Sequence, residues 1–309
     1  MNILTAFFKL VRWPNLLFIA LTQVLFRFFV LHFAYFGNIP GNWNIKLTLP
    51  LFFLLLAASL CIAAAGYIIN DYFDLNIDLV NKPSKLIIGR YIKRRWAIVL
   101  HVVLSFIGFI LSLYVGYKLW NFYIPFFNLI AILSLWLYST TFKKKLLIGN
   151  ILISLLSAWV ILVLTLAEYR FHLRPPDAHW RRLLKVSFIY AGFAFVISLV
   201  REVIKDMEDL PGDLKYGCRT MPIVWGLQVS KVFAAVWIVV LAGAIAIIQF
   251  YVMQLGWWFS ATYSLVAIFI PLLWVLRKLY EAKTQDEFHR LSTLVKLVML
   301  TGIVSMIFF

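Results

Sequence analysis

Long apolar runs are the feature that most constrains how this chain can fold. Crossing the hydrocarbon core of a bilayer takes about 20 apolar residues in a helix. Soluble proteins carry roughly 25% charged residues, whereas this chain of 309 residues is 63% hydrophobic and only 14% charged, so lipid must cover much of it. The sequence therefore predicts an all-α, polytopic membrane bundle in which residues 1–309 form one transmembrane domain. We predict nine spanning helices, at residues 14–36, 48–72, 96–117, 120–140, 146–168, 184–206, 230–252, 257–276 and 291–309.

The lysines and arginines in the short loops predict the orientation of the bundle. Cytoplasmic loops of membrane proteins are enriched in these residues. With a cytoplasmic N-terminus, five cytoplasmic segments hold most of them: Lys9/Arg12, 82–95, 143–145, 201–231 and 277–290. One outer loop, around 170–185, is also basic, but the opposite orientation has more exceptions. We therefore predict a multi-pass protein of the inner (plasma) membrane and no nucleic-acid partner, despite the net charge of +16.

Two clusters of acidic residues each end an apolar run on the predicted cytoplasmic side. In the first cluster, Asn70, Asp74 and Asp78 are spaced four apart and would share one face of a helix. The second cluster again steps by three or four residues. Pro211 and Gly212 should end its helix, so that Asp213 reaches in from a loop. The members of the two clusters are Asn70, Asp71, Asp74 and Asp78, and Glu202, Asp206, Glu208, Asp209 and Asp213.

Stacked carboxylates of this kind repel each other and need a cation. Mg²⁺ suits such hard oxygen ligands, and it is commonly bound by one or two carboxylates plus substrate phosphates. Basic residues that can bind a diphosphate lie close by: Lys82, Lys85, Lys143, Arg201 and Lys205. Lys143 to Lys145 fit an orientation signal equally well. A magnesium and diphosphate site beneath an apolar bundle predicts a lipid diphosphate as substrate.

At these residues the sequence resembles the UbiA-type intramembrane prenyltransferase family, which also has nine helices. The first cluster is similar to its Asn-Asp-x-x-Asp-x-x-x-Asp motif, although many members have arginine at Lys82. The second cluster is similar to its Asp-x-x-Asp-x-x-x-Asp motif, and most similar to the branch that makes archaeal-type ether lipids. Further matching positions are Arg12, Pro14, Asn15, Asn81, Pro83, Gly89, Tyr138, Ser139, Lys143, Gly149, Asn150, Gly217, Thr220, Pro222 and Gly226.

The resemblance implies an enzyme that transfers a prenyl group, expected to be geranylgeranyl, from a prenyl diphosphate to a lipophilic acceptor. The expected acceptor is geranylgeranylglycerol phosphate, which would give an ether lipid. An aromatic precursor of quinone, tocopherol or chlorophyll type is the alternative. No protein partner is implied. The expected cofactor is Mg²⁺, held by Asn70, Asp74, Asp209 and Asp213, with Asp71, Asp78 and Asp206 as second choices.

Further roles are expected for cavity residues. Asp78 or Glu202 would accept the proton of an acceptor hydroxyl, Tyr138 would contact diphosphate or acceptor, and Asn15 would line the cavity. Arg27, deep in the first span, is as well explained by snorkelling or helix pairing as by substrate contact. The histidines show no ligand spacing, and the two cysteines exclude a disulfide scaffold.

Three other functions compete with this one. A cation transporter would also place carboxylates on facing helices, but near the bilayer midplane and on broken helices. In this sequence, both acidic clusters lie at helix ends and next to lysines, which disfavours a cation path. A non-catalytic lipid-binding scaffold should have lost some ligands, whereas both clusters are complete. A membrane terpene cyclase or an aromatic prenyltransferase on the same fold would differ only in its product.

Overall fold

The computed structural model describes residues 2–36, 45–81, 86–169 and 178–309. Among these residues, nine helical segments are long and apolar enough to cross a membrane, which confirms the nine predicted spans. Six of them are single helices: α4 (Leu49–Phe73), α6 (Arg94–Lys118), α7 (Tyr123–Thr140), α8 (Ile148–Glu168), α9 (Ala178–Glu208) and α12 (Gly226–Gln254).

The other three spans contain a short π- or 3₁₀-helical stretch. The first joins α2 (Trp13–Leu25), η1 (Phe26–Val30) and α3 (Leu31–Phe36). The eighth joins α13 (Trp258–Ser264), η4 (Leu265–Phe269) and α14 (Ile270–Glu281). The last joins α15 (Gln285–Val304) and η5 (Ser305–Phe308).

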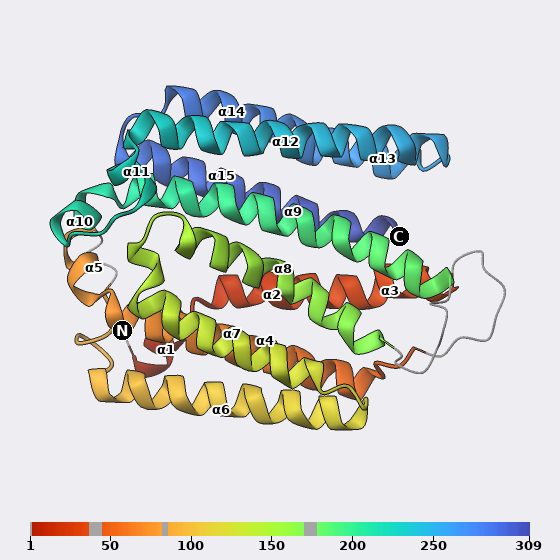
Figure 1. Cartoon of the computed structure of the whole chain (residues 1–309), viewed down its shortest axis with the longest axis horizontal. Helices are drawn as coiled ribbons and strands as arrows, with labels where there is room; N and C mark the ends of the chain where they lie inside the picture. Colours follow the sequence, from red (N-terminus) through yellow and green to blue (C-terminus); the bar gives the residue numbers. More distant parts are fainter. Residues whose placement is uncertain (1, 37–44, 82–85, 170–177) are drawn as a thin grey trace.

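The long helices lie lengthwise beside one another (Figure 1). Helix α4 packs against α6 and α7, and α9 packs against α8, α12 and α15. Phe26, Phe52 and Leu164 are fully buried between helices, whereas Phe106 and Ile247 remain 64% and 74% exposed on the outside. Apolar side chains therefore both fill the bundle and cover it, as expected where lipid is the solvent.

Short helices gather at one end of the bundle, called here the polar end (Figure 1). They are α1 (Ile3–Leu10), α5 (Leu75–Asn81), α10 (Leu210–Lys215) and α11 (Met221–Val224). Helices α5 and α10, which follow the two acidic spans, pack against each other. The fold thus brings both acidic clusters to the same end of the bundle. That this end faces the cytoplasm stays a prediction.

Candidate active site

The first acidic cluster spans two helices rather than the single helix predicted. Asp74 lies at the junction between α4 and α5. The Asp74 N–H donates to the Asn70 carbonyl (3.0 Å) and the Asp78 N–H donates to the Asp74 carbonyl (2.8 Å), so the four-residue spacing persists. Asn70 lines the main cavity of the bundle, whereas Asp78 lines a small separate recess beside Ile87. Asp78 therefore does not share the environment of Asn70.

The second cluster also continues into a new helix. Helix α9 ends at Glu208, and Asp209 is the N-cap of α10. The Asp213 N–H donates to the Asp209 carbonyl (3.1 Å), so Asp213 is helical and buried. The expectation that Asp213 reaches in from a loop is wrong. Pro211 ends a helix when it lies inside one, but it is tolerated in the first turn of the next.

Asn81 joins the two clusters. Its Nδ2 donates to the Asp209 carbonyl (3.1 Å), and the Gly212 N–H donates to its Oδ1 (2.9 Å). A Cβ at Gly212 would lie 2.5 Å from the side-chain amide of Asn81. Glycine is therefore required here by the close approach of α5 and α10.

Lys143 lies between the clusters. It belongs to the turn η3 (Phe142–Lys144) and its Nζ pairs with Asp74, both side chains being largely buried. Burial lowers the pKa of Lys143 to about 8, while the charge of Asp213 acts in the opposite direction. A Cβ at Gly149 would lie 2.9 Å from the Lys143 Cα, so this glycine lets the turn pack against α8. Lys143 thus interacts with both clusters.

Arg12 ties the start of α2 to the first cluster. Its Nη2 lies 2.6 Å from Asp71 Oδ1, and its guanidinium lies 5.4 Å from the ring centroid of Tyr67. The charge of Asp71 raises the pKa of Arg12 above its ordinary value. Arg12 has a left-handed backbone (φ 50°, ψ 55°), a costly conformation that tends to persist at functional sites.

Helix α9 presents alternating charges to the cavity. Glu202 lies 2.9 Å from Arg201 and 3.5 Å from Lys205, and all three line the cavity. One turn on, Asp206 Oδ2 accepts a hydrogen bond from Asn150 Nδ2 at 2.8 Å. Glu208 points elsewhere: it is buried against His289 of α15, at 2.9 Å.

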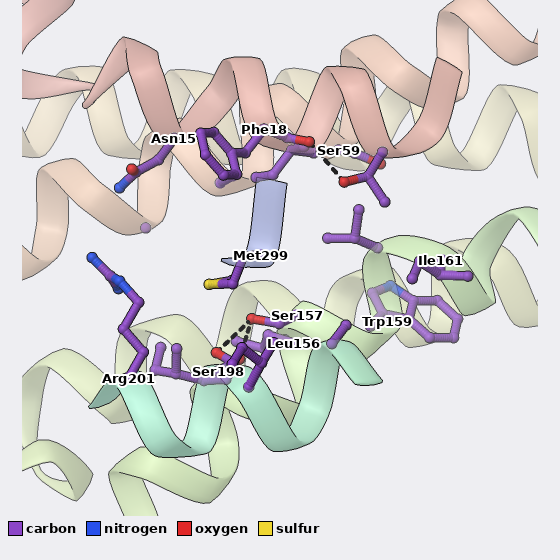
Figure 2. Close-up of a pocket in the computed structure, with 18 of the residues that line it drawn as sticks. Asn15, Phe18, Ser59, Leu156, Ser157, Trp159, Ile161, Ser198, Arg201 and Met299 are labelled. Atoms are coloured by element: carbon purple, nitrogen blue, oxygen red, sulfur yellow. Dashed lines mark hydrogen bonds between the residues drawn. The ribbon is translucent and has the colours of Figure 1, made fainter. Parts of the chain in front are cut away.

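The cavity has a volume of about 310 Å³ and lies between α2, α4, α7, α8, α9 and α15. In Figure 2, Asn15 and Arg201 lie at one end of it on opposite walls, and Trp159 and Ile161 lie toward the other end. A charged end and an apolar body fit an amphiphile with an anionic head group. The charged end is lined by Arg12, Asn15, Asn70, Tyr138, Arg201, Glu202, Lys205 and Lys296.

The donor set at the polar end fits Mg²⁺. Asn70 Oδ1 is buried and has no hydrogen-bond partner among the residues that the structure describes, and carboxylates of both clusters lie at the same end. Within the described ranges, no three His, Cys, Asp or Glu side chains converge enough to hold a metal ion by themselves. Mg²⁺ usually completes its shell with water and substrate phosphates, so a partial protein shell is what this ion requires.

The structure places only some of the predicted basic residues at the site. Lys82 and Lys85, predicted to bind diphosphate, fall outside the described residues. Arg27 does not line the cavity. Its Nη2 donates to the Leu47 carbonyl at 3.1 Å, in the segment just before α4. Lys296, which lines the cavity from α15, was not predicted from the sequence; a lysine alone inside an apolar span was the available signal.

These features define an integral membrane protein with a charged, magnesium-compatible site at one end of an apolar cavity. The model of the UbiA prenyltransferase family matches residues 28–297. The chain belongs to this family, and it is a prenyltransferase.

Known proteins are similar along most of the chain. Digeranylgeranylglyceryl phosphate synthase of Sulfurisphaera tokodaii is 31% identical over 240 residues, which cover 76% of each protein. Two solved structures share the fold. A UbiA homologue from Aeropyrum pernix K1 has a TM-score of 0.64 at 18% identity, covering 99% of each chain. A UbiA homologue from Archaeoglobus fulgidus, bound to DMAPP and Mg²⁺, has a TM-score of 0.57 at 14% identity, covering 97% of this chain and 98% of that one.

Proposed function

We propose that this enzyme transfers a geranylgeranyl group from its diphosphate to geranylgeranylglycerol phosphate, with Mg²⁺ as cofactor. The observation that carries the proposal is that both acidic clusters and Lys143 lie at the polar end of the bundle, where Asn70 and Glu202 line the charged end of an apolar cavity. The name of the Sulfurisphaera tokodaii relative supports the ether-lipid product. The Archaeoglobus fulgidus structure, which holds a prenyl diphosphate and Mg²⁺, supports the donor and the metal.

The polar end holds the donor diphosphate. Asn70, Asp74, Asp209 and Asp213 would bind magnesium, with Asp71 and Asp206 orienting the cations around it. The metal supplies Lewis-acid neutralisation of the diphosphate charge. Lys143 pairs with Asp74, which supports a role for its ammonium beside the diphosphate, and Arg201 and Lys205 would add positive charge from α9.

The reaction exchanges one carbon–oxygen bond for another. The bond between C1 of the prenyl chain and the diphosphate oxygen breaks, and diphosphate leaves with the electron pair. The acceptor hydroxyl oxygen forms the new ether bond to C1 and releases its proton. Glu202 is the only carboxylate among the described residues that lines the cavity, so we assign proton acceptance to it rather than to Asp78.

The cavity walls keep water from the reacting carbon. Phe18, Leu156 and Met299 line its body, and an electron-poor allylic carbon would otherwise be captured by water. Tyr138 and Asn15 line the charged end, where they contact diphosphate or acceptor. We place this end on the cytoplasmic side of the inner membrane, where both charged substrates would be available.

The test is transfer of radiolabel by the purified protein in detergent. Labelled geranylgeranyl diphosphate and Mg²⁺ would be offered with geranylgeranylglycerol phosphate or, separately, with 4-hydroxybenzoate. We expect label in an ether lipid, and no transfer after EDTA or in Asp209→Ala. Label only in the aromatic product would overturn the acceptor. Transfer to neither acceptor, with cation flux in liposomes, would instead favour the transporter.

A further inference from the structure

Lys296 is a charged residue in the cavity wall to which the proposed chemistry gives no role. It lies about 16 Å along α15 from Gln285, at ~1.5 Å per residue, and therefore inside a membrane span. Ionisable residues inside the membrane are costly, and they usually mark a functional site. The partners of Lys296 show what that function requires.

Both recorded contacts of Lys296 are with neutral groups. Its Nζ donates to Asn15 Oδ1 at 2.6 Å and lies 5.0 Å from the ring centroid of Phe18. No carboxylate in the described part of the chain pairs with it. An ammonium has three N–H donors, so the single hydrogen bond to Asn15 leaves two of them without an acceptor in the described ranges.

The other three cations of the cavity differ from Lys296 in this respect. Arg12 pairs with Asp71, and Arg201 and Lys205 both pair with Glu202. Within the described cavity lining, these three cations and Lys296 face one carboxylate, so the charged end is positive. Lys296 therefore supplies positive charge that no neighbouring side chain neutralises, and an anionic ligand would satisfy it.

Lys296 shares the cavity with Arg201 and Lys205, but it is not part of the acidic clusters. The Asp74–Lys143 pair is formed by the α4–α5 junction and η3, and neither residue lines the cavity. Lys296 enters the cavity from α15, which packs against α2 and α9. An anion held by Lys296 would therefore lie inside the cavity on its α15 wall, whereas magnesium held by the acidic clusters would keep the donor diphosphate at the polar end, beside Arg201 and Lys205.

We propose that Lys296 binds the phosphate of the acceptor and thereby selects a phosphorylated lipid over a neutral one. This inference rests on the proposed function. Asn15 holds the ammonium in place without neutralising it, and Phe18 and Met299 offer apolar surface beside it for the acceptor tail. The two substrates would thus be distinguished by two anion sites.

The first test compares Lys296→Met with Lys296→Arg. A hydrogen bond to a charged group is worth about 1.5–3 kcal/mol, so Lys296→Met should raise KM for geranylgeranylglycerol phosphate about tenfold to a hundredfold. KM for geranylgeranyl diphosphate should change less than about twofold, and Lys296→Arg should recover most of the loss. Lys118→Met, which removes an exposed lysine at the end of α6, is the matched control and should behave as wild type.

The second test removes the phosphate instead of the lysine. With dephosphorylated geranylgeranylglycerol, wild type and Lys296→Met should react at equal rates, so that the preference for the phosphorylated acceptor is lost only in the variant. Asn15→Asp should mimic Lys296→Met, because a carboxylate in place of the amide would pair with the ammonium.

The outcomes separate this inference from the function on which it rests. If wild type makes the ether lipid but Lys296→Met raises KM only for the donor, or for neither substrate, the inference is overturned and the function stands. A wild-type protein that prenylates only aromatic acceptors overturns both. Misfolding is excluded when Lys296→Met keeps the wild-type donor KM.

Discussion

Acidic groups at the two ends of the bundle have opposite surroundings. Glu168 ends α8 at the end opposite the polar end (Figure 1), and it is 1% exposed. Its Oε1 accepts from the Leu47 N–H (2.7 Å), and its Oε2 accepts from the Tyr35 hydroxyl (2.9 Å) and the Lys46 N–H (3.0 Å). At the polar end, Asp206 accepts a hydrogen bond only from Asn150 among the described residues.

By this difference, Glu168 is a structural carboxylate, whereas Asp206 has acceptor capacity left for a ligand. The donors to Glu168 come from two chain segments, α3 and the residues before α4, so this side chain holds both of them to α8. Asp206 and the unpartnered Oδ1 of Asn70 keep acceptor capacity that a cation or its hydration shell can use. Amide substitutions at the two ends test this comparison, because they remove the charge and keep the shape.

The largest effect is expected for Asp206→Asn. Losing a carboxylate that orients a metal or its surrounding cations typically costs up to about a hundredfold in activity. The amide oxygen still accepts from Asn150, and a partly buried charge is removed, so the unfolding temperature in detergent should stay the same or rise. Initial rates of label transfer and thermal unfolding measure the two effects. A variant that loses stability and keeps its activity would give Asp206 the role we assign to Glu168.

Glu168→Gln should show the reverse pattern. The amide places an NH₂ group where Glu168 now accepts from N–H or O–H donors, so at least one donor loses its partner at a cost of about 1–3 kcal/mol. The unfolding temperature should fall by several degrees, while activity per folded molecule stays close to wild type. Thermal unfolding in detergent, with rates normalised to folded protein, checks this. A large loss of activity without a loss of stability would contradict the structural role.

Sequence patterns predicted the features of the bundle that depend on neighbouring residues along the chain. Apolar run lengths located the nine spans, and helical spacing located the acidic clusters. Contacts between distant segments were not predictable in this way. The approach of Asn81 to Gly212 and the neutral partner of Lys296 depend on how helices pack, and no local pattern encodes that packing. Asp213 was misplaced because a proline that ends one helix can also begin the next.

The smallest effect is expected for Gln23→Leu, which tests whether an unpaired oxygen is enough to indicate function. Gln23 is fully buried, its Nε2 donates to Ser59 Oγ and the Val160 carbonyl (both 3.0 Å), and its Oε1 has no partner within the described part of the chain. Unlike Asn70, it does not line the cavity. Leucine removes two hydrogen bonds but also an unsatisfied acceptor, so stability should change by about 1 kcal/mol or less. Activity should stay within about threefold of wild type, measured as initial rates of transfer. A loss of activity as large as that of Asp206→Asn would mean that an unpaired buried oxygen affects the transfer rate even where no ligand can reach it.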